Sequence, residues 1–100
     1  MTVCDDMFYI ENLCPACHSG AIGFLRCNDG ISVVLMCNEC DAVWVNPNLV
    51  TIESAIFPSG PDFVVDAIGC SIAGDFARWA VKEEVERFGW THLIAGDGTA

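Results

Sequence analysis

Apolar residues along the chain fall into short runs that turn-forming residues separate. The runs AIGFLRC (21–27) and ISVVLM (31–36) are rich in residues that favour strands. Asp29-Gly30 stands between them and is a strong hairpin signal, because glycine tolerates the positive φ that the favoured turn requires. A two-residue loop at this point predicts the cross-strand pairs Cys27–Ser32, Leu25–Val34 and Gly23–Met36. The hairpin therefore returns the chain to the end from which it started.

Weaker signals follow the hairpin. AVWV (42–45) is expected to form a third strand, which Pro47 ends. LVTIESAIF (49–57) has a mixed pattern that fits a strand or a short helix. PSGP (58–61) predicts a turn, and DFVVDAIG (62–69) predicts another short strand.

The clearest helix is VKEEVERFG at 81–89. Glu83 and Arg87 stand one turn apart and are expected to form an ion pair on the solvated face of this helix. Gly89 is the expected C-terminal stop, and the tail is expected to fray after Gly96. Three apolar residues recur at helical spacing and predict the packed face: Val81, Val85 and Phe88.

Both faces of the predicted hairpin are apolar, whereas an antiparallel sheet with one solvated face alternates apolar and polar residues. A second layer must therefore cover the second face. Residues 47–100 are the expected cover, and a homodimer partner is the alternative. We expect one α+β domain over 1–100, with three antiparallel strands at 12–46 and a strand-and-helix extension at 47–100 packed on them. One face carries Ile22, Phe24, Val33 and Leu35, and the other carries Leu25, Val34 and Met36.

Charge narrows the classes of partner. The 100-residue chain has a net charge of −10, from fourteen acidic and four basic residues. This charge repels a phosphate backbone and argues against nucleic-acid binding. It would steer the chain toward a basic partner, most simply another protein. The alternative is that the acidity only keeps an apolar chain in solution.

The sequence gives no signal for export or for a membrane. MTVCDDMFYI lacks the positive start of a secretory signal. The longest apolar stretch, FVVDAIGCSIAG (63–74), is interrupted by Asp66 and is too short to span a bilayer. We therefore expect a cytoplasmic protein, in which cysteines stay reduced and clustered cysteines bind metal more readily than they form disulfides.

Four cysteines stand at metal-site spacing. Cys14 and Cys17 form one Cys-x-x-Cys pair, nineteen residues follow, and Cys37 and Cys40 form the second pair. Two intervening residues let a tight turn aim both sulfur atoms at one ion, and four thiolates complete a tetrahedron. The predicted hairpin brings Cys37 beside Cys17. The pattern therefore predicts a metal site at the open end of the hairpin.

Residues 12–46 resemble the zinc ribbon family, whose mark is a pair of Cys-x-x-Cys knuckles joined by a hairpin. The resemblance implies that Cys14, Cys17, Cys37 and Cys40 bind one zinc ion. Four protein sulfurs close the coordination sphere, so such a zinc is structural and not catalytic. Ribbons often carry glycine soon after each second cysteine. Here His18 and Asp41 follow directly, and Gly20 stands two residues further on at the first knuckle. Many ribbons bind nucleic acid or belong to transcription machinery, but their basic surface is missing here.

CPACH (14–18) has three rival interpretations. Haem attachment would use His18 as an axial ligand, but it requires export and leaves the second cysteine pair unexplained. A redox dithiol would need a strand–CxxC–helix context, whereas strands follow this pair. Iron in a rubredoxin-type site uses the same four sulfurs, and it would make the chain an electron-transfer protein. His18 itself fits a supporting or surface position better than a ligand position.

Nothing in the sequence predicts catalysis. GCSIAG (69–74) resembles a nucleophile elbow around Ser71, but Ala73 stands where that turn requires glycine. Three further cysteines follow no ligand spacing and are expected to be buried, unreactive thiols: Cys4, Cys27 and Cys70.

These features together predict a non-enzymatic, zinc-stabilised protein-interaction module. The concrete hypothesis is an acidic immunity or antagonist protein that blocks a basic partner such as a nuclease toxin. Its basis is the charge, the small size and the closed metal site. The alternatives are a rubredoxin-like electron-transfer protein and a transcription-associated zinc ribbon.

Overall fold

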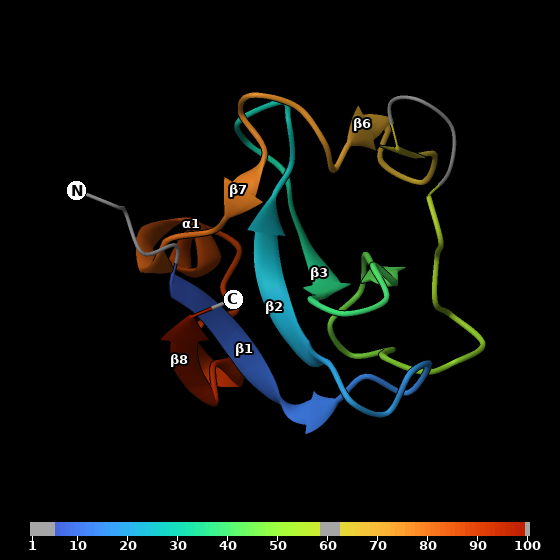
Figure 1. Cartoon of the computed structure of the whole chain (residues 1–100). Helices are drawn as coiled ribbons and strands as arrows, with labels where there is room; N and C mark the ends of the chain where they lie inside the picture. Colours follow the sequence, from blue (N-terminus) through green and yellow to red (C-terminus); the bar gives the residue numbers. More distant parts are fainter. Residues whose placement is uncertain (1–5, 59–62, 100) are drawn as a thin grey trace.

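The computed structural model describes residues 6–58 and 63–99 (Figure 1). Most of the regular structure in this part of the chain is antiparallel sheet, and one short α-helix and one 3-10 turn follow near its end. Part of the predicted PSGP turn lies outside the described residues. The elements, in chain order, are β1 (Asp6–Leu13), β2 (Ala21–Arg26), β3 (Val33–Cys37), β4 (Val43–Trp44), β5 (Val64–Val65), β6 (Cys70–Ser71), β7 (Arg78–Trp79), α1 (Lys82–Arg87), the 3-10 turn η1 (Thr91–Leu93) and β8 (Gly96–Thr99).

The main sheet is built around β2. Its strand order is β4-β3-β2-β1-β8, and β7 also pairs with β2. β3 pairs along one edge of β2, so both β1 and β7 must pair along the other edge. On that edge, β1 pairs with β2 at Gly23, and β7 pairs with it at Leu25. β5 and β6 form a separate two-stranded sheet. The predicted third strand is present as β4, but it is only two residues long.

The register of the β2–β3 hairpin was predicted correctly. The Cα partners include Leu25–Val34 and Gly23–Met36. Beyond the last strand pair, the N–H of Cys27 donates to the carbonyl of Ser32 over 2.7 Å. Since a one-residue slip would exchange the two faces of each strand, this register decides which side chains meet each core.

The loop of this hairpin is wider than predicted, because four residues, 28–31, lie between the closing pair. Gly30 has a φ of 75°, as its place in the turn requires. The Oδ1 atom of Asp29 accepts hydrogen bonds from the N–H groups of Ile31 and Ser32 at 2.9 and 2.8 Å. These bonds satisfy the backbone of the wider loop, and a two-residue turn would leave no room for them.

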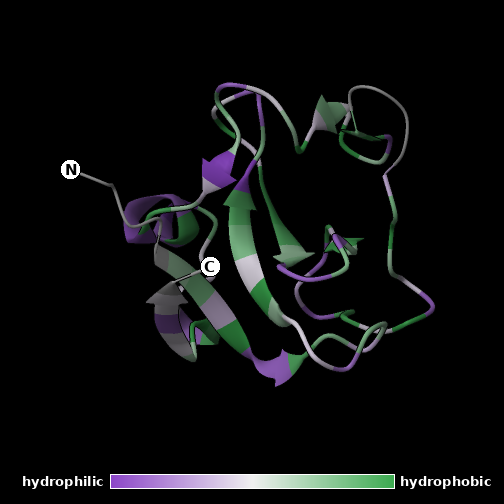
Figure 2. Cartoon of the chain, viewed as in Figure 1, coloured by the Kyte–Doolittle hydropathy of each residue, from purple (hydrophilic) through white to green (hydrophobic). Residues whose placement is uncertain are grey.

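The two faces of the hairpin contribute to two apolar clusters, and hydrophobic colouring accordingly runs along β2 and β3 (Figure 2). The face that carries Phe24 and Leu35 packs on residues from α1 and the region around η1. The face that carries Leu25 and Val34 packs on β5, β6 and β7. The covering residues are Val85, Trp90 and Leu93 on the first face and Val65, Cys70 and Trp79 on the second.

One edge of the main sheet is formed by β1 and β8, and the sequence predicted neither strand. The expectation of a frayed tail after Gly96 is wrong, because Gly96–Thr99 is β8. Its residues pair with β1 from Asp6–Thr99 to Tyr9–Gly96. Strand pairing uses backbone groups, so a glycine-rich segment can form a strand when a partner strand supplies the hydrogen bonds.

α1 lies within the predicted helix, and Gly89 follows it with a φ of 75°, as expected for a helix stop. The predicted apolar face is only partly correct. Val85 is fully buried, but Val81 and Phe88 are 44% and 40% exposed. α1 is the longest helix among the described residues, and none of their helices is long and apolar enough to cross a membrane.

The charged residues of α1 are arranged differently from the prediction. The expected Glu83–Arg87 ion pair is wrong, since the ion pairs of the described helix are made by Glu84. Its carboxylate lies 3.2 Å from Nη1 of Arg26 and 3.1 Å from Nη1 of Arg78. Glu84 is only 8% exposed, and this partly buried network joins the helix to β2 and β7.

Candidate metal centre

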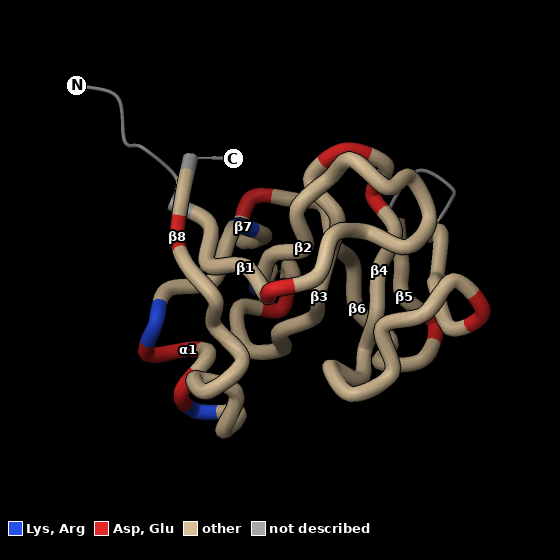
Figure 3. The backbone as a smooth tube through the Cα atoms, turned by 90° about the horizontal axis from the view of Figure 1, so that it is seen from below, with Lys and Arg blue, Asp and Glu red and all other residues tan. Residues whose placement is uncertain are grey.

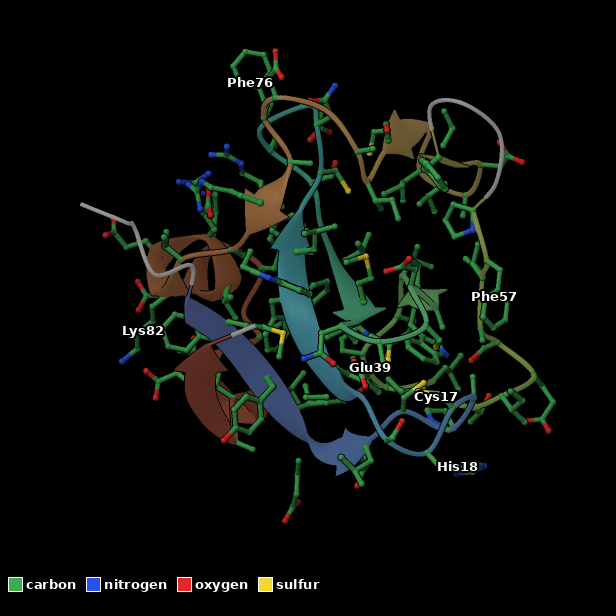
Figure 4. The ribbon with its side chains drawn as sticks, viewed as in Figure 1. Cys17, His18, Glu39, Phe57, Phe76 and Lys82 are labelled. Carbon is green, nitrogen blue, oxygen red and sulfur yellow. The ribbon has the colours of Figure 1, made fainter. Side chains whose placement is uncertain are left out.

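Two loops of the main sheet bring two pairs of cysteines together. Cys14 and Cys17 lie between β1 and β2, while Cys37 ends β3 and Cys40 lies in the loop after it. Ile22, near the start of β2, pairs with Cys37, so both loops lie at the same end of the hairpin. Figure 4 shows Cys17 at this end of the sheet. The hairpin thus brings the second pair beside the first, as the sequence predicted.

The four sulfur atoms form a compact group. The Sγ atoms of Cys14 and Cys40 are 3.6 Å apart, as are those of Cys17 and Cys37. All four lie within 4.8 Å of one another. Sulfurs placed about 2.3 Å from a central zinc form a tetrahedron with edges of about 3.8 Å, whereas a disulfide bond is about 2.0 Å long. The spacing therefore suits four thiolates around one metal ion.

The two Cys-x-x-Cys turns have the same local structure. The N–H groups two and three residues after Cys14 donate to its Sγ at 3.3 and 3.5 Å. In the second turn, Glu39 and Cys40 donate to the Sγ of Cys37 at the same two distances. Hydrogen bonds of this kind favour the charged form of the sulfur. Each turn therefore supplies two N–H donors to the sulfur that a metal ion would hold as a thiolate.

The residue after each second cysteine adopts a left-handed backbone. His18 and Asp41 both have a φ of 63°. Histidine and aspartate are among the side chains that tolerate this conformation best. His18 is exposed and does not belong to the clustered ligand atoms, in agreement with the expected surface position. Both residues therefore serve the turn of the backbone rather than the coordination of a metal.

Two residues that sequence reasoning did not assign to the site hold the loops together. The carbonyl of Gly20 accepts from the N–H of Cys14 at 3.0 Å, and a Cβ on Gly20 would lie 2.3 Å from the Sγ of Cys37. The Oδ1 of Asn38 accepts from the N–H of Ala21 at 3.0 Å. The role of Gly20 could have been predicted from the sequence, because a glycine soon after a Cys-x-x-Cys pair is a known feature of such turns. The role of Asn38 could not, because its hydrogen-bond partner Ala21 is known only from the fold.

The thiols of the group differ in acidity. Backbone N–H groups of Ser19 and Gly20 lower the pKa of Cys17 to about 6. Burial raises the pKa of Cys37 to about 12, and burial also raises the pKa of Cys40. The buried thiols therefore keep their protons until a cation compensates the charge. Metal binding at such a group releases protons and becomes weaker at low pH.

The group is closed toward other ligands. Cys14 and Cys37 are 1% and 0% exposed, and Cys17 and Cys40 are half-buried. Within residues 6–58 and 63–99, no other His, Cys, Asp or Glu joins the cluster. Four sulfurs complete the coordination of a tetrahedral ion, so the arrangement fits a structural metal and offers no open position for a substrate.

The sequence predicts that the three cysteines outside the cluster are buried and unreactive. Cys27 is fully buried, whereas Cys70 is only half-buried. Cys4 lies outside the described residues. Neither Cys27 nor Cys70 joins the metal-site group.

The fold and the site define a small, mainly antiparallel protein with a four-cysteine cluster that could bind a metal ion. The chain is 30% identical over 90 residues to the uncharacterized protein L48 of Acanthamoeba polyphaga mimivirus, in an alignment that covers 82% of the chain and 72% of L48. The chain belongs to the same family as L48. No protein-family model matches the chain, and no solved structure matches it.

Proposed function

We propose that the chain is a zinc-stabilised protein-interaction module without catalytic activity, built on a zinc-ribbon-like centre. The ligands of its single Zn²⁺ would be Cys14, Cys17, Cys37 and Cys40. The observation that carries this proposal is the tetrahedral spacing of their sulfur atoms at the open end of a β-hairpin. The positive φ of His18 and Asp41 adds support, because ribbons often have glycine soon after the second cysteine of each knuckle.

The proposed zinc stabilises the fold and takes no part in a reaction. Binding of structural zinc to small peptides releases about 10–16 kcal/mol at neutral pH, and this is also folding free energy. The ion would join the loop before β2 to the loop after β3. It would thereby fix the open end of the hairpin on which both apolar clusters are built.

The proposed partner is a basic protein, and the uneven distribution of charge supports it. Arg26 and Arg78 are bound to Glu84, which leaves Lys82 and Arg87 on α1 as the other basic residues of the sequence. Figure 3 shows blue only around α1, β7 and β2, whereas the opposite side, near β4 and β5, carries red alone. A positively charged surface would therefore be attracted to the side that lies away from α1.

That side also exposes large apolar side chains. The loop before β5 and the β5–β6 hairpin carry them, and the exposed carboxylates of Glu53 and Asp66 lie in the same two segments. Figure 4 shows Phe57 on the side of the molecule opposite Lys82. A partner with an apolar anchor ringed by lysine or arginine would match this surface. The exposed residues include Leu49 (55%), Ile52 (50%), Phe57 (56%) and Phe63 (43%).

The metal part of the proposal is tested by expression in medium that contains both zinc and iron, followed by native mass spectrometry. We expect one zinc ion per chain. Cys37→Ser should lose the ion, whereas Cys70→Ser, a cysteine outside the cluster, should keep it. A folded protein without metal, or equal metal content in the two variants, would contradict the proposed centre.

The partner part is tested with two charge-reversal variants of equal size. Glu53→Lys/Asp66→Lys changes the apolar, acidic side, and Glu83→Lys/Glu86→Lys changes α1 by the same amount. Partners captured from the native source are identified, purified and titrated against each variant. We expect a basic protein whose affinity falls at least tenfold for the first variant and little for the second. An acidic partner, or equal losses for both variants, would refute the proposed surface.

A second candidate is electron transfer by iron bound to the same four sulfurs. The observation in its favour is the set of N–H···S bonds, two in each knuckle, because hydrogen bonds to sulfur tune the potential of iron–sulfur centres. Native mass spectrometry and the visible spectrum of the same sample distinguish the candidates. A coloured iron form that undergoes reversible reduction supports electron transfer, and a colourless zinc form from iron-rich medium excludes it.

A further inference from the structure

Two cysteines outside the metal centre lie on neighbouring chain segments. Cys27 follows β2, and Cys70 begins β6. The next residues join the two segments, because the N–H of Asn28 donates to the carbonyl of Ser71 over 2.8 Å. Cys27 is buried in the apolar cluster against which Cys70 packs. Residues far apart in the sequence thus form a dithiol pair.

The two thiols differ in access. Cys70 lines an open hollow of about 450 Å³ next to Asn28, Gly69 and Gly74, whereas Cys27 is fully buried and does not line it. Burial raises the pKa of Cys27 to about 12, and the neighbouring Cys70 adds to this effect. A small molecule in the hollow would therefore meet Cys70 before it could meet the buried Cys27.

We propose that Cys27 and Cys70 form an oxidation site that reacts with low-molecular-weight disulfides and closes to an intramolecular disulfide bond. In the first step, the Cys70 sulfur attacks one sulfur of the small disulfide. One small thiol leaves with the proton of Cys70, and a mixed disulfide forms on Cys70. In the second step, Cys27 attacks the Cys70 sulfur, and the second small thiol leaves with the proton of Cys27. Two protein thiols are oxidised, and one small disulfide is reduced to two thiols.

The bond would link parts of the described fold that no strand pairing joins. β5 and β6 pair with each other and form no strand pair with the main sheet among the described residues. A Cys27–Cys70 bond would attach this hairpin covalently to the end of β2. The exposed residues Phe63 and Val64 would then be held in place on the main sheet.

The metal-loaded protein offers a direct test with oxidised glutathione as the probe. Peptide mapping after alkylation should show a Cys27–Cys70 disulfide while the metal content stays unchanged. The oxidised protein should unfold at a higher temperature than the reduced one. Cys27→Ser should instead accumulate glutathione on Cys70, because the second step is blocked. This trapped adduct distinguishes a reactive pair from a merely structural contact.

Cys70→Ala provides a second variant, at a half-buried position where folding is less at risk. Its Cys27 should stay free of glutathione. Three results would overturn the proposal. In the first, both thiols remain free in the folded protein. In the second, glutathione stays on Cys70 of the unsubstituted chain and no Cys27–Cys70 disulfide forms. In the third, the metal-site cysteines are oxidised and the metal is lost before any Cys27–Cys70 bond forms. Metal content and thiol state are measured separately, so failure of the metal proposal is distinguishable from failure of this one.

Discussion

At the residue scale, Gly20 shows how closely the backbone approaches the cysteine cluster. A Cβ at this position would lie 2.3 Å from the Sγ of Cys37 and 2.9 Å from the Cγ of Glu39. The Sγ of Cys37 cannot withdraw without moving its knuckle. Glycine is therefore needed here for space, and this requirement is different from the positive φ seen at Gly30.

Gly20→Ala is expected to weaken metal binding about 10–100-fold, the range seen when the surroundings of a metal ligand are disturbed. The measurement is competition for zinc against a chromophoric chelator. Gly30→Ala is the matched control, because a Cβ there meets no atom within 4 Å, although its positive φ costs some stability. Equal zinc affinity for Gly20→Ala and the unsubstituted chain would show that the knuckle can move aside.

Glu84 is the buried carboxylate of the described chain. Burial alone would raise its pKa, but the N–H of Val81 and the guanidinium groups of Arg78 and Arg26 outweigh this effect. The pKa therefore lies below its ordinary value of 4.5. A carboxyl group with a depressed pKa stabilises the fold above its unfolded-state pKa, and this contribution is lost as the pH falls through the folded-state pKa.

Glu84→Gln is expected to lower the free energy of unfolding by about 2 kcal/mol at neutral pH, the magnitude for hydrogen bonds to charged groups. The difference from the unsubstituted chain should shrink as the pH falls below 4.5. Urea unfolding of both proteins at matched metal content measures it. Glu83→Gln, at an exposed neighbour, should change little at any pH. A difference that stays constant down to pH 3 would rule out an ionic contribution.

At the element scale, the β2–β3 hairpin was predictable in its register and not in its loop. The apolar pattern on both strands favours one register, in which Leu25 lies opposite Val34. The loop depends on the side chain of Asp29, which accepts from two backbone N–H groups and from the hydroxyl of Ser32. A turn-residue pattern does not reveal which of these competing arrangements is formed.

Asp29→Ala is expected to destabilise the hairpin by about 1–2 kcal/mol, because two backbone N–H groups lose their acceptor. Asp29→Asn should lose less, since its amide oxygen can still accept these bonds. The free energy of unfolding of the metal-loaded proteins measures both changes. Equal losses for the two variants would show that the charge of Asp29, and not its acceptor geometry, stabilises the loop.

The strand β8 lay beyond the reach of sequence patterns. Glycine is depleted in strands, so GDG predicts a turn. In the fold, a Cβ on Gly96 would lie 2.6 Å from the hydroxyl oxygen of Tyr9. Glycine is therefore present because an aromatic ring of β1 occupies the space beside it. Both the strand pairing and the need for glycine depend on β1, and Tyr9 lies 87 positions from Gly96 in the sequence. Local propensity cannot reveal such a partner.

At the scale of the whole molecule, the two apolar clusters share the β2–β3 hairpin, and the cysteine cluster lies at its open end. The paired Cys-x-x-Cys spacing was sufficient to place the four sulfur atoms together. The sequence could not predict which side of the molecule is acidic, because composition does not reveal that Arg26 and Arg78 are paired with Glu84. Net charge is a property of the sequence, whereas its distribution is a property of the fold.

Removal of the metal is expected to abolish cooperative unfolding, because the binding free energy of about 10–16 kcal/mol is comparable to the whole stability of a small domain. Excess chelator should remove the thermal transition seen by circular dichroism, and added zinc should restore it. The same chelator already saturated with zinc is the control. An unchanged transition after complete metal removal would mean that the two apolar clusters hold the fold alone.

The pairing of β1 with β8 also determines how the molecule would respond to mechanical force. Asp6 begins one strand and faces Thr99 at the end of the other, so a pull on these two residues acts across the ladder and not along it. Hydrogen bonds loaded in this way break one after another, from Asp6–Thr99 toward Tyr9–Gly96. Tension would peel β8 away at low force before it reached Leu13 and the cysteines beyond. The cysteine cluster would therefore bear the load only after β1 and β8 have separated.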